Sequence, residues 1–422
     1  MMRILNYGEI SESEILAREI PQLAVADTVA EILARVRAEG DRALFDYCAR
    51  FDGAHLTSLR VSQAEMDAAF AAVDKALLRV LERAADNIRA FHEKQKRDSF
   101  VLSETEGVVL GQRYLPIERV GLYVPGGTAP LSSTVLMDAI PAKIAGCGEL
   151  ILVTPPGRDG TIHPAILASA HIAGVDQIFK IGGAQAVAAL AYGTESVPKV
   201  DKIVGPGTAY VSEAKKQVYG LVSIDMIAGP SEILVVADGK SDPVCVAADL
   251  LSQAEHDKNA SAVLVTDSPA LAEAVQSEIE VQLSVLPRQE IARASVEKNG
   301  KIIVTPDLDT ALSIANALAP EHLELCLDAP FDYLGRVKHA GSVFLGRSSP
   351  EALGDYLAGA NHTLPTGGTA RFSSPLSVDD FMKKTQFIYY SKEAFAGAAE
   401  DIARFARAEE LEGHARSALA RL

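Results

Sequence analysis

The chain contains 422 residues, of which 48% are hydrophobic and 23% are charged. This is the balance of an ordinary globular protein, and a prior of about 150 residues per domain predicts two or three domains with a sizeable core. The formal net charge of −16 argues against polyanion binding, because neutralising phosphates requires basic patches.

The sequence has no apolar run approaching the roughly 18 residues of a membrane span, and its N-terminus lacks the apolar core of a signal peptide. We therefore expect a cytoplasmic protein with a small-molecule ligand and without nucleic-acid or membrane partners. Its four cysteines form no C-x-x-C motif, which makes a cysteine zinc site improbable and favours buried free thiols. Cys326, close to Glu321 and His322, is the one cysteine that could be a nucleophile.

The first hundred residues predict helices. Residues 28–51 carry apolar residues at helical spacing and are interrupted at Gly40, which indicates two helices around a tight turn. Ser62 and Glu65 form a capping box for the next helix, and Asp74 caps another that runs to about residue 96. We expect these helices to pack on the second of the two sheets described next.

From residue 108 the pattern becomes an alternation of strands and helices. Such an alternation is typical of parallel, doubly wound sheets. The predicted strands fall into two sets, 120–124, 150–154, 177–181 and 202–204, then 232–237, 262–265, 301–304, 323–327 and 342–345. The sequence thus predicts an α/β protein with two doubly wound, incomplete Rossmann-like domains, a helical N-terminal segment and a C-terminal helical tail.

We expect the following domain organisation: an N-terminal segment over 1–25, one domain formed by 26–119 together with 230–376, a second domain over 120–229, and a tail over 377–422. The part of the tail from residue 391 reads as an amphipathic helix that Gly413 should break. Glu409 and His414 flank that break, which could let both converge on one ligand, although a solvated helix end is the simpler interpretation.

Glycine-rich turns follow three strands of the first set, at 123–127, 182–185 and 205–207. Such turns bring the backbone close to a phosphate or ribose, although each could also be a plain connection between strand and helix. None of them is a G-x-G-x-x-G, so a Rossmann fingerprint is absent. Three such turns on one sheet nevertheless favour a ligand at its edge.

The stretch DLLSQAEHD at 249–257 is the best candidate for a metal site. It ends a predicted helix, on which Gln253 and His256 are three residues apart and project from nearly one face. We expect them to face the loops at the carboxyl ends of the strands, where open parallel sheets bind ligands. Imidazole is a good zinc ligand, but a glutamine carbonyl is a poor one. The alternative to a metal site is therefore that both residues are polar side chains capping an exposed helix end.

Two further stretches carry residues for acid–base or metal chemistry. Glu321 and His322 precede a strand and could form an acid–base pair if the turn at Pro320 distorts the backbone, because neighbouring residues on a strand otherwise face opposite ways. Asp355 and His362 lie in a polar, glycine-rich loop and could be metal ligands, or simply turn residues.

Together these pieces closely resemble the L-histidinol dehydrogenase family over almost the whole chain. The matching stretches include GDRAL at 40–44 and FDG at 51–53, then VGLYVPGGTAPLSSTVLMD at 120–138, GGAQAVAALAYGTESVPKVDKIVGPG at 182–207, GPSEILVVAD at 229–238, DLLSQAEHD at 249–257, PEHLEL at 320–325, GSVFLG at 341–346 and GDYLAGANHTLPT at 354–366.

The resemblance implies a zinc-dependent enzyme that oxidises L-histidinol to L-histidine through the aldehyde and reduces two NAD⁺. It implies a homodimer with one zinc ion per subunit, in which Glu409 and His414 are donated across the interface. Catalysis would fall to His322 as the general base and to Glu321, which would activate water. The implied zinc ligands are Gln253, His256, Asp355 and His414. The substrate would be held by these four residues together with His322, Ser231 and Glu409. NAD would contact Tyr123, Gln185 and Thr208.

One position departs from the family pattern, because the last NAD contact is often Asn and is Thr208 here. The nearest alternative function is a dehydrogenase of the same fold, with zinc and NAD, that oxidises another small alcohol such as a sulfonated diol. An anionic substrate should place Arg or Lys near Ser231 and Glu409, and the matched motifs contain none there. A zinc hydrolase, an aldehyde dehydrogenase using Cys326 and a non-catalytic binding protein are more distant alternatives.

Overall fold

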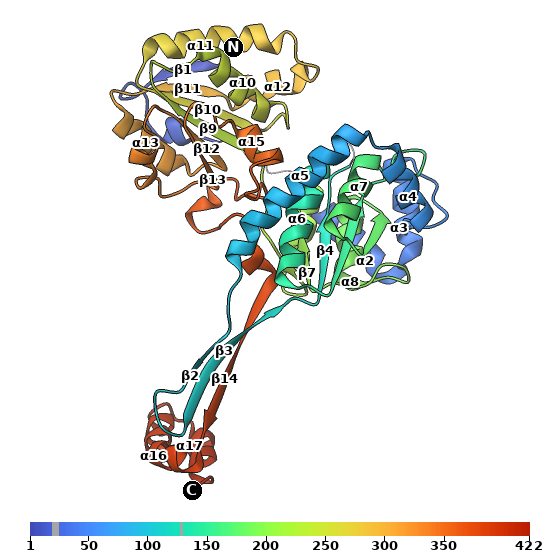
Figure 1. The fold of residues 1–422 in the computed structure, drawn as a ribbon, viewed down its shortest axis with the longest axis vertical. Helices are drawn as coiled ribbons and strands as arrows, with labels where there is room; N and C mark the ends of the chain where they lie inside the picture. The colour runs from blue at the N-terminus through green and yellow to red at the C-terminus, as the bar shows by residue number, and fades with distance from the viewer. Residues whose placement is uncertain (19–24, 127–129) are drawn as a thin grey trace.

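The computed structural model describes residues 1–18, 25–126 and 130–422. Two α/β domains lie next to each other, and a long arm leads away from them to a helical tip at the C-terminus (Figure 1). Among the described residues, none of the helices is both long and apolar enough to cross a membrane.

The first domain is built on sheet A, whose six parallel strands have the order β1-β11-β10-β9-β12-β13. These strands are β1 (Arg3–Asn6), β9 (Glu232–Ala237), β10 (Ser261–Thr266), β11 (Lys301–Val304), β12 (His322–Cys326) and β13 (Ser342–Leu345). Its helices are α1 (Glu12–Leu16), α10 (Pro243–Ala254), α11 (Pro269–Leu283), α12 (Gln289–Lys298), α13 (Leu308–Leu318), α14 (Phe331–Leu334) and α15 (Glu351–Tyr356), with a 3₁₀ turn at Thr369–Arg371.

The second domain is built on sheet C, with five parallel strands in the order β6-β5-β4-β7-β8. Its strands are β4 (Arg119–Tyr123), β5 (Glu149–Thr154), β6 (Gln177–Lys180), β7 (Lys202–Val204) and β8 (Ser223–Ile224). The helices between them are α6 (Ser132–Ala145), α7 (Pro164–Ala173), α8 (Gly183–Tyr192) and α9 (Ala209–Val218). The prediction of two doubly wound parallel sheets is confirmed.

Both faces of each sheet are buried, which is why the strands are almost uniformly apolar. Alternate residues of β5 point to opposite faces: Leu150 and Leu152 belong to one hydrophobic core, Ile151 and Val153 to the other. Sheet A is buried in the same way, with α10, α11 and α12 over one face and α13 over the other.

The early helices pack on sheet C, contrary to our expectation that they cover the other sheet. They are α2 (Ala26–Glu39), α3 (Asp41–Tyr47), α4 (Gln63–Ala72) and α5 (Lys75–His92), with a π turn at Cys48–Asp52 and a 3₁₀ turn at Glu93–Gln95. α2 contacts α8 and α9, whereas α4 and α5 contact α6 and α7. Their periodicity specifies an apolar face but cannot specify which sheet it covers.

Both ends of the chain also depart from the predicted segments. Residues 3–6 form the edge strand β1 of sheet A, so the N-terminal segment begins as part of that domain; residues 19–24 lie outside the described residues. Past Ser377 the chain forms a 3₁₀ turn at Val378–Phe381 and then a long strand, β14 (Met382–Tyr390), where a helical tail was expected.

The arm is an antiparallel sheet, sheet D, in which β14 pairs with β3 (Val108–Pro116), and β3 pairs with β2 (Phe100–Leu102). It leads to α16 (Lys392–Ala408) and α17 (Glu412–Leu419), which pack against each other at its far end (Figure 1). The break between these helices falls at residues 409–411, where Glu410 has a φ of 61°, and not at Gly413, which is inside α17.

Candidate active site

The candidate catalytic residues gather at the amino edge of sheet A. His322 is the first residue of β12, and Ser231 immediately precedes β9. Because α10 runs antiparallel to the strands it connects, its last turn, with Gln253, returns to the same edge. The expectation that Gln253 and His256 face the carboxyl ends of these strands is therefore wrong.

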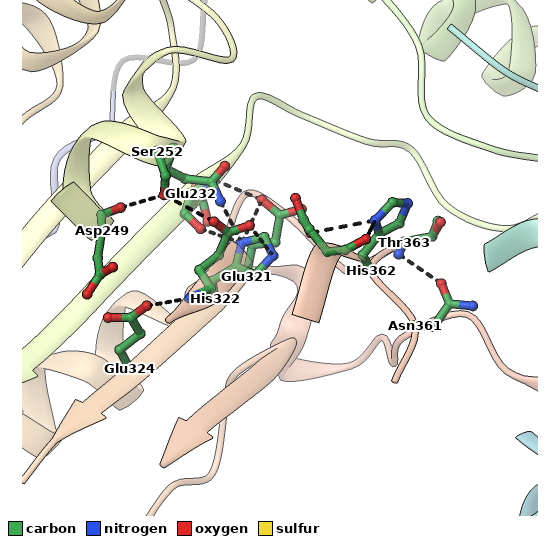
Figure 2. Close-up of polar contacts among 12 residues, drawn as sticks. Glu232, Asp249, Ser252, Glu321, His322, Glu324, Asn361, His362 and Thr363 are labelled. Atoms are coloured by element: carbon green, nitrogen blue, oxygen red, sulfur yellow. Dashed lines mark hydrogen bonds and ion pairs between the residues drawn. The ribbon is translucent and has the colours of Figure 1, made fainter. Parts of the chain in front are cut away.

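Glu321 and His322 converge on the start of β9. The carboxylate oxygen Oε2 of Glu321 accepts a hydrogen bond from the Glu232 backbone N–H at 2.8 Å, and Nδ1 of His322 lies 3.0 Å from the Glu232 carbonyl oxygen. Nδ1 of His322 is also 3.6 Å from Oε2 of Glu321 (Figure 2). The distortion required for this convergence lies just before Pro320, where Ala319 takes the left-handed conformation with φ 48°.

Two contacts of Nδ1 bear on which imidazole nitrogen of His322 can act as a base. The Glu232 carbonyl oxygen only accepts, so it favours the tautomer with the proton on Nδ1 and the lone pair on Nε2, whereas the Gln253 amide nitrogen, 3.1 Å from the same Nδ1, favours the opposite tautomer. Burial lowers the pKa of His322 to about 4, which keeps the ring neutral at neutral pH, with one nitrogen available as a base. Burial also raises the pKa of Glu321 well above its usual value, which makes its carboxylate, once ionised, a stronger base.

Three ligand-type side chains come close together beside this pair. One ligand atom from each of His322, Glu351 and Asp355 lies within 4.8 Å of the other two. The Oε1 atom of Glu351 is buried without a hydrogen-bond partner among the described residues, 3.8 Å from Nε2 of His322. Burial, followed by the charge of Asp355, raises the pKa of Glu351 to about 8, so this carboxyl group holds a proton at neutral pH, and a cation at this point would favour its ionised form.

Asp355 is held as a carboxylate by His362. Burial opposes its ionisation, but the hydrogen bond and charge of His362 outweigh burial and hold the pKa of Asp355 below its usual range. The Nδ1 atom of His362 lies 3.5 Å from Oδ1 of Asp355. A cavity of about 260 Å³, lined among others by His322, Asp355 and His362, opens beside the group.

The predicted metal ligands are brought together only in part. Gln253 is buried, with its amide nitrogen 3.1 Å from Nδ1 of His322, and Asp355 lies in the group just described. His256 is exposed in the turn after α10. His414 lies on α17 and Glu409 at the end of α16, both exposed at the tip of the arm and far from this site (Figure 1).

The predicted cofactor contacts lie together at the carboxyl edge of sheet C. Tyr123 ends β4, and its hydroxyl oxygen accepts a hydrogen bond from the Gly183 backbone N–H at 3.0 Å. Gln185 is buried in the first turn of α8, which follows β6, and Thr208 is exposed at the start of α9, which follows β7. Gly127, the last residue of the first glycine-rich turn, lies outside the described residues.

The two edges face each other across a polar interface that the sequence did not reveal. Near the start of α6, Oγ1 of Thr134 lies 3.3 Å from Nε2 of His362, and one turn later Asp138 accepts a hydrogen bond from Thr363 at 3.1 Å. Asp138 closes the motif at 120–138, and Glu351 lies one helical turn before Asp355. In the sequence, only the place of Asp138 at the end of that motif and the four-residue spacing of Glu351 from Asp355 could have indicated that these two residues lie near the site.

The cysteines do not form a catalytic site. Cys326 is buried in β12, and burial raises its pKa, which suppresses the thiolate that a nucleophile needs. Cys48 and Cys147 are buried as expected, whereas Cys245 is exposed on α10, contrary to the prediction of buried thiols.

The sequence and the fold of this chain are similar to those of one family of known proteins. The family model for histidinol dehydrogenase matches residues 17–422. The chain is 54% identical to the histidinol dehydrogenase of Syntrophotalea carbinolica, with 100% of this chain and 99% of the relative covered, and 52% identical to that of Heliobacterium mobile, with 100% of both covered. The crystal structure of histidinol dehydrogenase from Elizabethkingia anophelis superposes with a TM-score of 0.95 at 41% identity, covering 100% of this chain and 98% of that one.

The buried side chains of Glu321 and His322 lie in a domain that contacts a sheet edge with glycine-rich turns, in a doubly wound α/β fold. With these matches, that arrangement defines the protein as an NAD-dependent oxidoreductase. Within that class, the chain belongs to the histidinol dehydrogenase family.

Proposed function

We propose that the protein oxidises L-histidinol to L-histidine through L-histidinaldehyde, with two NAD⁺, at a zinc site completed by a second copy of the chain. The observation that carries this proposal is the buried, neutral His322 imidazole beside Glu351 and Asp355, in a cavity whose lining residue His362 contacts Thr134 of the other domain.

The acid–base pair suits two successive oxidations. In the first, His322 takes the hydroxyl proton of the alcohol while a hydride passes to NAD⁺, which gives the aldehyde, NADH and a proton. Glu321 then takes a proton from water as the water oxygen bonds to the aldehyde carbon, and His322 returns its proton to the carbonyl oxygen, which gives the hydrate. In the second oxidation His322 takes a hydroxyl proton of the hydrate while its hydride passes to a second NAD⁺, which gives the carboxylic acid.

The proposed zinc ligands are Gln253, His256 and Asp355 of one chain and the partner subunit's His414. Two imidazoles and a carboxylate are ordinary nitrogen and oxygen ligands of Zn²⁺, and the amide oxygen of Gln253 would be the weak fourth ligand. The carboxylate of Asp355, whose pKa is held below its usual range, favours a cation at this position. A bound zinc ion would anchor the imidazole and amine of the substrate, and so supply orientation.

The arm supports an exchange between subunits. Its nine-residue strand β14 extends over roughly 30 Å at about 3.4 Å per residue and leads to the helices with Glu409 and His414 at the far end of the arm, away from the site of their own chain (Figure 1). The arm also exposes large apolar side chains: Val101 is 61% exposed, Ile388 73% and Phe405 69%. Apolar surface of this kind marks a protein–protein contact. In the proposed homodimer, Glu409 from the partner's arm and Ser231 from the body bind the cationic substrate.

We further propose that NAD⁺ contacts Tyr123, Gln185 and Thr208. Tyr123 at the end of β4, Gln185 after β6 and Thr208 after β7 lie at the edge of sheet C where ligands of open parallel sheets bind. The nicotinamide would then reach across the interface at Thr134 and His362 towards His322.

The test is NADH formation with limiting L-histidinol and zinc-loaded protein at slightly alkaline pH. Two NADH per histidinol, abolished by a chelator and restored by Zn²⁺, is the expected result. One NADH would mean that oxidation stops at the aldehyde and would refute the role of Glu321. If the protein forms no NADH from histidinol but oxidises another small alcohol, histidinol is not its substrate.

A further inference from the structure

A second polar cluster lies directly behind the candidate active site, and the mechanism above does not use it. It consists of Asp249 on α10 and Glu324 and Cys326 on β12, and one ligand-type atom of each lies within 4.8 Å of the other two. Glu324 is only 1% exposed. Figure 2 shows the side chains of Asp249 and Glu324 pointing toward each other.

Two carboxyl groups this close and this buried cannot both be ionised. Burial, followed by the charge of Asp249, raises the pKa of Glu324 to about 9, and burial also raises the pKa of Asp249. One shared proton therefore links the two groups at neutral pH. The Oε1 atom of Glu324 is committed elsewhere, because it accepts a hydrogen bond from the Glu351 backbone N–H at 2.7 Å.

Asp249, Glu324 and Glu351 form a hydrogen-bonded network, and each of them shares a helix or a strand with a residue of the candidate site. Asp249 lies four residues before Gln253 on α10, and Glu351 lies four residues before Asp355 on α15, so each pair shares a helix face. Glu324 lies two residues after His322 on β12 and points to the same face of the sheet. The network thus joins the three elements that carry the candidate site.

We propose that Asp249 and Glu324 are positioning residues whose shared hydrogen bond, together with the bond from Glu324 to the start of α15, sets the separation of Gln253 and Asp355 for one zinc ion. This inference rests on the proposed zinc-dependent function. Apolar residues would fill the same space without burying charge, but they would leave the Glu351 N–H without an acceptor and let α15 shift.

Substitutions that keep these hydrogen bonds should preserve zinc affinity, and substitutions that remove them should lower it. Glu324→Gln keeps an acceptor for the Glu351 N–H and offers an amide donor to Asp249, and Asp249→Asn offers an amide donor to Glu324. Both variants should bind Zn²⁺ within about threefold of the wild-type affinity. Glu324→Leu and Asp249→Ala remove the contact and should weaken Zn²⁺ binding by roughly 10–100-fold, as loss of support behind metal ligands does elsewhere.

Zinc affinity of the purified dimer is measured by competition with a chromophoric chelator, and the thermal midpoint of the metal-free protein is measured in parallel. Weaker binding in Asp249→Ala, restored in Asp249→Asn, supports the proposal even if Glu324→Leu fails to fold. A lower thermal midpoint with unchanged zinc affinity in Asp249→Ala would overturn it, because the pair would then stabilise only the fold.

A wild-type dimer that binds no zinc would refute the proposed function, and the inference with it. Wild-type zinc binding at ordinary affinity, with every variant equal to it, would refute the inference alone.

Discussion

Subunit complementation tests whether the site is shared between chains. His322 belongs to the body of the chain and His414 to the tip of its arm, separated by a strand of roughly 30 Å. His322→Ala and His414→Ala should each abolish oxidation of histidinol as homodimers. A heterodimer of the two variants contains one site with both defects, and one in which the intact body of one chain meets the intact arm of the other.

The expected recovery of kcat follows from the number of intact sites in the heterodimer. With two equivalent sites per dimer and one of them intact, the purified heterodimer should recover about half of the wild-type kcat. The two variants are coexpressed with different affinity tags, the doubly tagged dimer is isolated by two successive columns, and NADH formation is followed at saturating substrate.

The matched control pairs His322→Ala with Asp355→Ala. Both changes lie on the body, so each site of that heterodimer keeps one defect and no recovery is expected. Absence of recovery in the His322→Ala and His414→Ala heterodimer would refute the shared site, because each arm would then serve its own chain or neither.

Three further predictions address the cofactor edge, the core and the domain interface. Thr208→Val should raise the KM for NAD⁺ roughly three- to tenfold, as expected for loss of about 1 kcal/mol from one hydrogen bond, without changing stability, since the Thr208 side chain does not cap α9; an unchanged KM removes it from the cofactor site. Phe179→Ala, at a fully buried position of β6, should cost about 3–5 kcal/mol in urea unfolding, and a loss below about 1 kcal/mol would contradict its place in the core. Burial raises the pKa of Asp138 from 3.8 to about 7, so the folded state holds a proton that the unfolded chain releases, and stability falls as the pH rises through this range. Asp138→Asn should flatten that fall between pH 4 and 7, and identical pH profiles for variant and wild type would refute the assignment.

The sheets could be predicted because their information is local. Runs such as residues 232–237, apolar and rich in β-branched residues, specify a strand buried on both faces. The short edge strand β8 escaped prediction because two residues carry no pattern. Strand β14 escaped because most of it is exposed, and MKKTQFIYY therefore lacks the alternation of a half-buried strand.

The arrangement of the site could not be predicted from local patterns. The spacing of Gln253 and His256 indicated a common face but not which edge of the sheet the helix end approaches. That edge is set by the antiparallel course of α10 against β9 and β10. Glu324 and Asp249 look like ordinary charged residues in the sequence, and only the fold brings them together behind Gln253 and Asp355.

The most direct test of the account is a crystal structure of the zinc-loaded dimer with NAD⁺, with anomalous data collected at the zinc edge. We expect one anomalous peak per subunit, bonded to Gln253, His256 and Asp355 of one chain and to the partner subunit's His414, with NAD⁺ at the carboxyl edge of sheet C. A peak at Asp249, Glu324 and Cys326, or a zinc ion without any ligand from the second chain, would contradict it.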